Sequence, residues 1–225
     1  MKEVLVSSLQ EYIALVLQGD AVGQLYRGQA DRNWPLEPSI FRDKEKLARL
    51  WGEAYATREE TLLYHFKIES RPYLQQVPNS RLEEIVVAQH HGLPTRLLDW
   101  TLSPLIALLF AVSDHRAGTD PCVIVCDQVE FIQLDEDLLG DPNKITEPVA
   151  FTPLHSSARV KNQQSVFTVN VNDEYPHLRK IVLPGKLSNM IQFQLHQLGI
   201  NSKSIYPDLD GVANWIKRFH LVGLE

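Results

Sequence analysis

Three stretches of the chain hold side chains whose types and spacing could do chemistry. The first is Tyr26-Arg27-Gly28-Gln29, which places an arginine at the end of a short apolar run. The guanidinium of Arg27 is planar and carries five donors, so it could hold the oxygens of a phosphate or a ribose. Gly28 would let a ligand approach the backbone. A buried ion pair of Arg27 with a turn at Gly28 explains the same residues, and both interpretations stay open.

The second stretch, residues 89–101, concentrates polar, aromatic and turn residues ahead of an apolar segment. Such a concentration lines a pocket or fixes a buried polar network. Asp99 could orient Arg27 or Arg96, and Trp100 could stack on a ring. In the alternative interpretation Arg96 and Asp99 form an internal ion pair and Trp100 belongs to the core. The candidate ligand-binding residues here and just beyond are Thr95, Arg96, Asp99, Trp100, Thr101 and Ser103.

The third stretch, residues 157–167, carries Arg159 and Lys161 and then the pair Gln163-Gln164 before a strand-like segment. Taken alone, this composition is typical of a solvated loop. The two glutamines become candidates only together with the resemblance described below.

The elements around these stretches follow from periodicity and caps. Ser8 and Ser80, each followed three residues later by glutamate, predict helix starts. Ser103-Pro104 predicts the start of a buried helix, and Gly92 the end of the helix before it. Periodicity predicts helices at 9–17, 105–112, 188–198 and 209–219 and two more within 43–74. It predicts strands at 24–26, 122–126, 165–171 and 180–183.

Because the helices cluster early and the strands late, the order predicts an α+β fold rather than regular βαβ winding. We expect a helical N-terminal half packed on a central, mostly antiparallel sheet, in a single domain of 225 residues.

Composition excludes several classes of protein. The net charge of −6 argues against a broad nucleic-acid footprint. A local basic cleft stays open, because six cations could meet there: Arg27, Arg32, Arg42, Arg96, Arg159 and Lys161.

The longest apolar run, 105–112, is far shorter than the roughly 20 residues of a membrane span. Cys122 and Cys126 lie too far apart along one expected strand for a disulfide. We therefore expect a reduced, cytoplasmic setting, no membrane partner and no metal, since the histidines form no ligand cluster.

Three segments together resemble the FRG domain, a family named for an aromatic-Arg-Gly motif that is Tyr26-Arg27-Gly28 here. They are YRGQADRNWPLEPSIFR at 26–42, AQHHGLPTRLLDWTLSPLIALLFAV at 88–112 and ARVKNQQSVF at 158–167. GINSKSIYPDLDGVANWI at 199–216 resembles the family's C-terminal portion. We therefore expect residues 1–225 to form one FRG-type domain.

The order of these motifs is similar to that of the ADP-ribosyltransferase superfamily. Its first motif ends a strand in arginine, as at Arg27, and its second is a strand with hydroxyl residues, as at 99–104. The resemblance implies an ADP-ribosyltransferase-like fold and NAD as substrate. It also implies an ADP-ribosyltransferase or NAD glycohydrolase that acts on an unknown protein or nucleic-acid acceptor, with a toxin or bacterial defence effector as the biological setting.

The third motif of that superfamily supplies a catalytic glutamate, and the matching place here holds Gln163 and Gln164. An amide can hydrogen-bond a ribose hydroxyl but carries no charge, so a nearby acid such as Glu147 could take the role. We predict Gln163, Gln164 and His91 as catalytic residues, His91 because histidine as a residue type can exchange a proton near neutral pH. The alternatives are a nucleotide-sensing module that does not turn NAD over and a nucleic-acid-binding module.

Overall fold

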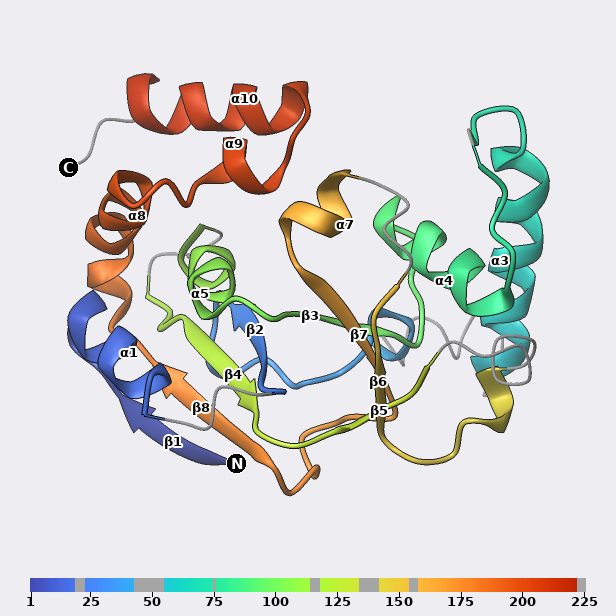
Figure 1. Ribbon diagram of the computed structural model, residues 1–225, viewed down its shortest axis with the longest axis horizontal. Coiled ribbons are helices and arrows are strands. Elements are labelled where there is room, and N and C mark those ends of the chain that lie inside the picture. The colour runs from blue at the N-terminus through green and yellow to red at the C-terminus, as the bar shows by residue number, and fades with distance from the viewer. Residues whose placement is uncertain are drawn as a thin grey trace.

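The computed structural model describes residues 1–18, 23–42, 55–74, 76–113, 118–133, 142–153 and 158–221. Its centre is one eight-stranded sheet in the order β1-β8-β4-β2-β3-β7-β6-β5 (Figure 1). The strands are β1 (Lys2–Leu5), β2 (Leu25–Gln29), β3 (Leu98–Thr101), β4 (Cys122–Cys126), β5 (Glu130–Phe131), β6 (Val149–Phe151), β7 (Ser165–Val169) and β8 (Leu178–Val182).

The sheet is mixed. The two outermost pairings, β1 with β8 and β5 with β6, are parallel, and all the inner pairings are antiparallel. Strands β2 and β3, which carry two of the three candidate stretches, are neighbours, and β7 follows β3 directly. The middle of the sheet therefore brings all three stretches side by side.

Helices lie at both ends of the sheet and across its middle. In Figure 1, α1 and α8 lie at the β1–β8 end, α3 and α4 at the opposite end, and α5 between them. The helices are α1 (Leu9–Val16), α3 (Tyr55–Ser70), α4 (Arg81–His90), α5 (Pro104–Ser113), α7 (Ala158–Asn162), α8 (Ser188–Gln197), α9 (Ser202–Ile205) and α10 (Leu209–Ile216). A π-helical turn, Lys217–Leu221, extends α10. Within the described ranges, no helix is long and apolar enough to cross a bilayer.

The predicted helix starts are confirmed. The hydroxyls of Ser8 and Ser80 accept from the backbone N–H of Glu11 and Glu83 at 3.1 and 3.2 Å, which satisfies donors that the first turn leaves unpaired. Ser103 caps α5 through the N–H of Ile106 at 3.4 Å. Gly92 and Gly199 end α4 and α8 with φ near +90° and +81°, a conformation that favours glycine.

Three apolar clusters hold the layers together. Alternate residues of β4 point to opposite faces, so that Val123 and Val125 pack against α1, α5 and α8 while Ile124 joins Trp100 on the other face. A third cluster joins α3 and α4 to β6 and β7, with Leu63 and Phe167 among its members. Helix α5 thus seals one face of the middle strands, as its apolar sequence predicts.

The α+β class is confirmed, and most of the sheet is antiparallel. The expected division into a helical first half and a stranded second half is not supported, since β1, β2 and β3 come early and four of the helices come after residue 157. Strands β1, β5 and β6 have only two to four residues each, too few to carry a clear alternation. Residues 43–54 of the expected helical region lie outside the described residues.

Candidate functional site

A cavity of about 520 Å³ opens over the middle strands β2, β3 and β7, where the three candidate stretches meet. Its wall includes the segment after β2 and Phe110 of α5. The cavity brings together six of the predicted site residues, namely Arg27, Gly28, Asp99, Trp100, Thr101 and Gln163.

Arg27 of β2 is fixed to Asp99 of β3. Its Nη1 donates to the backbone oxygen of Asp99 at 2.6 Å and to the carboxylate Oδ2 at 2.9 Å. The Arg27 side chain is 13% exposed, whereas that of Asp99 is 63% exposed. Of the two pairings the sequence left open for Asp99, the structure selects the one with Arg27.

The guanidinium of Arg27 keeps unused hydrogen-bonding capacity. Its Nε is buried and has no hydrogen-bond partner within the described part of the chain. A buried donor without a partner costs free energy unless a water or a ligand satisfies it. The Arg27 pair is therefore more than an internal ion pair, because part of the fork still requires an acceptor.

The charge state of Asp99 follows from the same contacts. Desolvation acts to raise the pKa of Asp99, but the positive charge of Arg27 and hydrogen bonds from Arg27 and Gln89 outweigh it. The net result is a pKa below the ordinary value for aspartate. Asp99 is thus ionised at neutral pH and supplies a permanent counter-charge to Arg27.

Gln163 contributes a second unsatisfied donor. Its side-chain Nε2 is buried without a partner among the residues described, and it lines the same cavity as Arg27. Its backbone is anchored, since Thr101 Oγ1 donates to the Gln163 carbonyl at 2.7 Å. Thr101 in turn accepts from the N–H of Ser103 at 3.0 Å. Two residues with buried, unpartnered donors, Arg27 of β2 and Gln163 in the turn before β7, therefore line one cavity.

Gln164 lies beside the cavity but does not line it. Its side chain is exposed and its φ is +49°, a left-handed conformation uncommon for residues other than glycine. The carbonyl of Gln164 accepts from Leu102 N at 3.1 Å, which ties this turn to the end of β3. Its contribution to the site is the turn that presents Gln163.

Gly28 serves packing rather than ligand approach. A Cβ on Gly28 would lie 2.1 Å from the carbonyl oxygen of Ala107 and 2.5 Å from the nitrogen of Ala111. Helix α5 therefore crosses β2 at a distance that only glycine permits. This close crossing places Phe110 against the cavity.

Trp100 belongs to the core, as the alternative interpretation had it. It is 3% exposed, and its Nε1 donates to Thr168 Oγ1 at 2.8 Å. An aromatic ring that remains accessible at the cavity is Trp34, which is 43% exposed. Sequence reasoning missed Trp34 as the stacking candidate, although it lies inside the motif quoted at 26–42.

Two charged residues of the same motif also belong to the site, Glu37, which was not predicted, and Arg42, which was named only among the cations of a possible basic cleft. Glu37 and Arg42 line the cavity, and Arg42 Nε donates to the Glu37 carbonyl at 3.1 Å. Desolvation and the neighbouring charge of Arg27 lower the pKa of Arg42, while Asp99 and Glu37 act to raise it. The wall thus carries two cations and two carboxylates. The sequence signal that could have identified Glu37 and Arg42 was the density of charged residues in the motif at 26–42.

The remaining predicted residues lie elsewhere. Thr95 is fully buried, donates through Oγ1 to Gln89 Oε1, and accepts on its carbonyl from Ile40 N at 3.1 Å. Ser103 caps α5. His91 is exposed at the end of α4, where its ring centroid lies 6.4 Å from that of Phe66. None of these three residues lines the cavity that holds Arg27.

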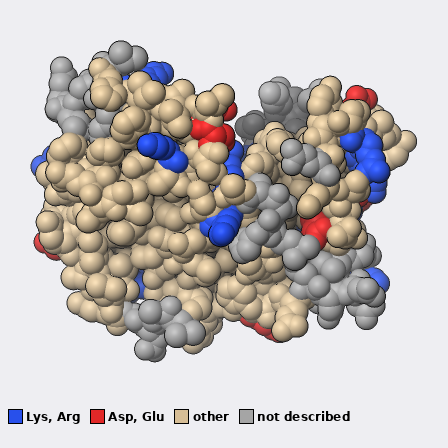
Figure 2. Space-filling model, turned by 45° about the horizontal axis from the view of Figure 1, so that its top comes forward, with Lys and Arg blue, Asp and Glu red and all other residues tan. Residues whose placement is uncertain are grey.

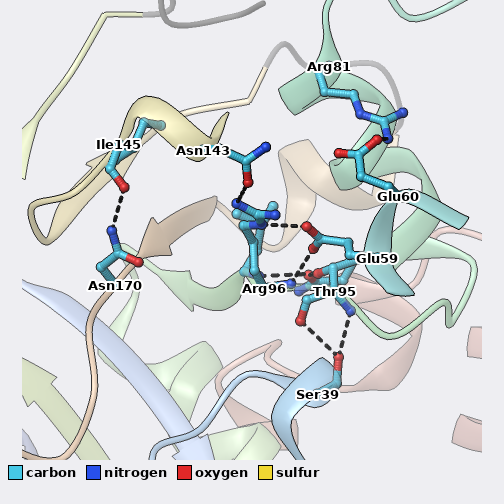
Figure 3. Close-up of polar contacts among 11 residues, drawn as sticks. Ser39, Glu59, Glu60, Arg81, Thr95, Arg96, Asn143, Ile145 and Asn170 are labelled. Atoms are coloured by element: carbon cyan, nitrogen blue, oxygen red, sulfur yellow. Dashed lines mark hydrogen bonds and ion pairs between the residues drawn. The ribbon is translucent and has the colours of Figure 1, made fainter. Parts of the chain in front are cut away.

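Arg96 lies in a neighbouring cavity of about 830 Å³ and is held internally. Figure 3 shows its guanidinium between Glu59 of α3 and Asn143, with Nη1 donating to the Asn143 Oδ1 at 2.8 Å. Its backbone N–H also donates to Glu59 Oε1 at 2.7 Å. Glu59 is almost completely buried, so this is an interior ion pair. Glu147 lines neither cavity, and its carbonyl accepts from Asn170 at 3.4 Å.

The six cations named from the sequence do not meet in one cleft. Arg27 and Arg42 share the cavity, but Arg32 pairs with Glu3 at the sheet edge and Arg159 lies 4.5 Å above the ring of Tyr206. Figure 2 shows Lys and Arg as separate patches on a largely uncharged face. In the part of the chain that is described, no three His, Cys, Asp or Glu side chains are grouped to hold a metal ion.

Comparison with known proteins confirms the family resemblance over the first part of the chain. Residues 23–120 match the FRG domain. The match includes Arg27, Asp99 and Phe110 but ends before Gln163, so the cavity is completed from outside the matched region. Neither the curated proteins nor the solved structures yield a match to this chain.

Proposed function

Taking an FRG domain at residues 23–120 as the starting point, we propose that the Arg27 cavity binds NAD or a related nucleotide. The observation that carries this proposal is the buried, unpartnered Nε of Arg27 at the cavity wall. A guanidinium binds phosphate through two parallel N–H donors. On its side edge, these donors are Nε and one terminal nitrogen. A diphosphate or a ribose supplies the acceptors that this edge lacks.

The rest of the wall suits the other parts of a nucleotide. The volume of about 520 Å³ lies within the usual range of small-molecule sites. Trp34 offers an accessible aromatic face for a base or a nicotinamide ring, and Gln163 offers a second donor for ribose or phosphate oxygens. These groups come from two central strands and the segments next to them, which is a rigid frame for a folded ligand.

We further propose that the protein consumes the bound NAD, as an ADP-ribosyltransferase or an NAD glycohydrolase with an ADP-ribosyltransferase-like fold. Cleavage of the nicotinamide bond proceeds through an oxocarbenium-like state and depends mainly on holding the ligand in a reactive pose. The wall carboxylates Glu37 and Asp99 are the negative charges within the lining that could stabilise such a cation. A protein or nucleic-acid acceptor and a cytoplasmic toxin or defence role belong to the same proposal.

The experiment combines nicotinamide release with calorimetric NAD binding on the same samples. We expect Arg27→Ala to lose both, and Arg27→Lys to bind weakly because lysine offers a point charge instead of a fork. Arg32→Ala is the matched control, since Arg32 pairs with Glu3 and does not line the cavity. Wild-type affinity in Arg27→Ala, or wild-type protein that binds no NAD, would refute the proposal.

Binding without turnover is the second candidate, and the position of Gln163 favours it. The related superfamily pattern expects a glutamate there, and Gln163 brings a neutral amide to the wall instead. The test is Gln163→Glu. A sensor should bind NAD without release as wild type, and the new carboxylate should either start nicotinamide release or weaken binding by repelling phosphate. Release by the wild type itself would exclude this candidate.

A further inference from the structure

The unpaired edge of Arg27 is set by residues that lie behind the cavity. Both acceptors of Nη1 belong to Asp99, one being its backbone oxygen and the other Oδ2. The edge formed by Nε and the other terminal nitrogen is what remains for a ligand. Which edge is left depends on how the Asp99 carboxylate is held.

Gln89 of α4 holds that carboxylate from the other side. Its Nε2 donates to Asp99 Oδ1 at 2.8 Å, while Oδ2 accepts from Arg27. The two oxygens are thus fixed separately, one by an amide and one by a guanidinium. The carboxylate is prevented from turning by contacts with two different elements, α4 and β2.

The orientation of the Gln89 amide is itself determined by Thr95. Thr95 Oγ1 accepts from Leu97 N at 3.2 Å and donates its own hydrogen to Gln89 Oε1. An ionised carboxylate only accepts, so Asp99 requires the NH₂ end of the amide and Thr95 the carbonyl end. Thr95 is anchored in turn, because its N–H donates to Ser39 Oγ at 3.0 Å, as Figure 3 shows.

We infer that Gln89 is a positioning residue for the ligand-binding arginine, acting through Asp99 to leave the side edge of Arg27 free for an oxyanion. The inference rests on the proposed function. Gln89 and Thr95 do not line the cavity, so they influence a ligand only through this chain of hydrogen bonds. The relay accounts for Gln89 and Thr95, two polar residues of the sequence stretch 89–101 that do not line the cavity.

Two substitutions separate this role from a merely structural one. Gln89→Glu keeps the size of the side chain and its acceptor for Thr95, but it replaces the donor to Asp99 by a second carboxylate. Gln89→Leu removes both polar contacts. If Gln89 only fills space and bonds Thr95, the glutamate variant should be the milder one. If it positions Arg27, the glutamate variant should be the more severe, because the added carboxylate competes for the free edge.

The measurements are the NAD dissociation constant and the titration of the Asp99 carboxyl carbon by NMR, with Gln10→Glu and Gln10→Leu on the exposed face of α1 as controls. We expect NAD binding to weaken roughly tenfold in Gln89→Leu, as for loss of a hydrogen bond to a charged group, and more in Gln89→Glu. The Asp99 titration should move to higher pH in the same order. The other charged groups whose electrostatic interaction with Asp99 the structure shows are Arg27 and Arg42 on the cavity wall.

A glutamate variant that binds NAD as wild type does, or an Asp99 titration unchanged in both Gln89 variants, would overturn the inference. Wild-type protein that binds no NAD would overturn the proposed function alone. In that case the order of the Asp99 titrations, which needs no ligand, still decides whether Gln89 fixes the carboxylate. Thermal melting of each variant shows that the compared proteins are folded.

Discussion

Arg27 and Asp99 are joined twice, because one nitrogen of the arginine donates both to the main chain and to the side chain of the aspartate, at 2.6 and 2.9 Å. The residues lie on the neighbouring antiparallel strands β2 and β3. The contact with the backbone oxygen ties Nη1 to the main chain of β3. The contact with Oδ2 supplies the charge that makes a mostly buried arginine tolerable.

The first prediction concerns acid stability. The pKa of Asp99 is lower in the folded state than its ordinary value of about 4, so the ionised carboxylate stabilises the fold above about pH 4. This stabilisation is lost as the pH falls through the pKa of the folded state. Asp99→Asn should therefore destabilise the protein at pH 7, with a difference from wild type that shrinks toward pH 3. Urea unfolding at a series of pH values measures it. Glu69→Gln on the exposed face of α3 is the control, and a difference independent of pH would contradict the prediction.

The second prediction concerns the crossing of α5 over β2. Gly28→Ala should cost about 3 kcal/mol or more in unfolding free energy, because the new Cβ would meet backbone atoms of Ala107 and Ala111 that cannot rotate away. Gly92→Ala is the comparison, since Gly92 has a positive φ but open space around it. That substitution should cost about 1–2 kcal/mol from the left-handed backbone alone. Chemical denaturation of both variants measures the two costs. Equal costs in unfolding free energy would mean that α5 can shift away from β2 at little cost and would contradict the prediction.

The parts of this fold that could be predicted are those encoded locally. The serine caps, the glycine helix ends and the apolar helix after Ser103-Pro104 all lie within a few residues of the feature they determine. The β-branched strand at 122–126 is likewise recognisable by itself, because every one of its residues is buried. Strands β5 and β6 are not, since they are short and gain their stability from neighbours far along the chain.

The candidate site could be predicted only in part for the same reason. Arg27 and Asp99 were identified from residue type and from the turns around them. The partners that decide the roles of the other candidates come from distant segments. Arg96 is bound by Glu59, which lies 37 positions away on α3. The indole of Trp100 donates to Thr168 on the neighbouring strand β7. No periodicity within residues 89–101 contains that information.

The third prediction tests the interior role of Arg96. Glu59→Ala should lower the unfolding free energy by about 3–5 kcal/mol, because it leaves the Arg96 guanidinium largely buried without its counter-charge. Glu60→Ala removes the next carboxylate of α3, which pairs with Arg81 at the surface (Figure 3), and should cost about 1 kcal/mol or less. Thermal and urea unfolding give both values. If Glu59→Ala instead abolished nucleotide binding at unchanged stability, Arg96 would belong to the ligand site.

The fourth prediction concerns the two thiols of β4. Burial raises the pKa of Cys122 and of Cys126 to about 12. At pH 8 the thiolate fraction of each is therefore about a thousandfold below that of a free cysteine. Labelling by a chromogenic disulfide should be correspondingly slow in native protein and immediate in urea. Rapid modification of native protein would contradict the buried placement of these cysteines.

The fifth prediction separates the two tryptophans near the cavity. Trp34 is 43% exposed at the wall, whereas Trp100 is 3% exposed and bonded to Thr168. Trp34→Ala should leave stability within about 1 kcal/mol of wild type and weaken NAD binding roughly tenfold, since aromatic stacking on a base contributes about 1–3 kcal/mol. Trp100→Ala should instead lower the unfolding free energy by about 3–5 kcal/mol through the cavity it creates.

Tryptophan fluorescence provides a measurement with its own control. NAD should quench the tryptophan emission of wild type and of Trp100→Phe, which keeps an aromatic core residue. Most of this quenching should be absent in Trp34→Phe, because the indole that contacts the ligand has been removed. A phenylalanine still stacks, so the affinity of Trp34→Phe should stay within a few-fold of wild type while that of Trp34→Ala falls. Quenching that persists in Trp34→Phe and disappears in Trp100→Phe would place the ligand's ring against the core tryptophan, and the cavity wall at Trp34 would then have no part in binding.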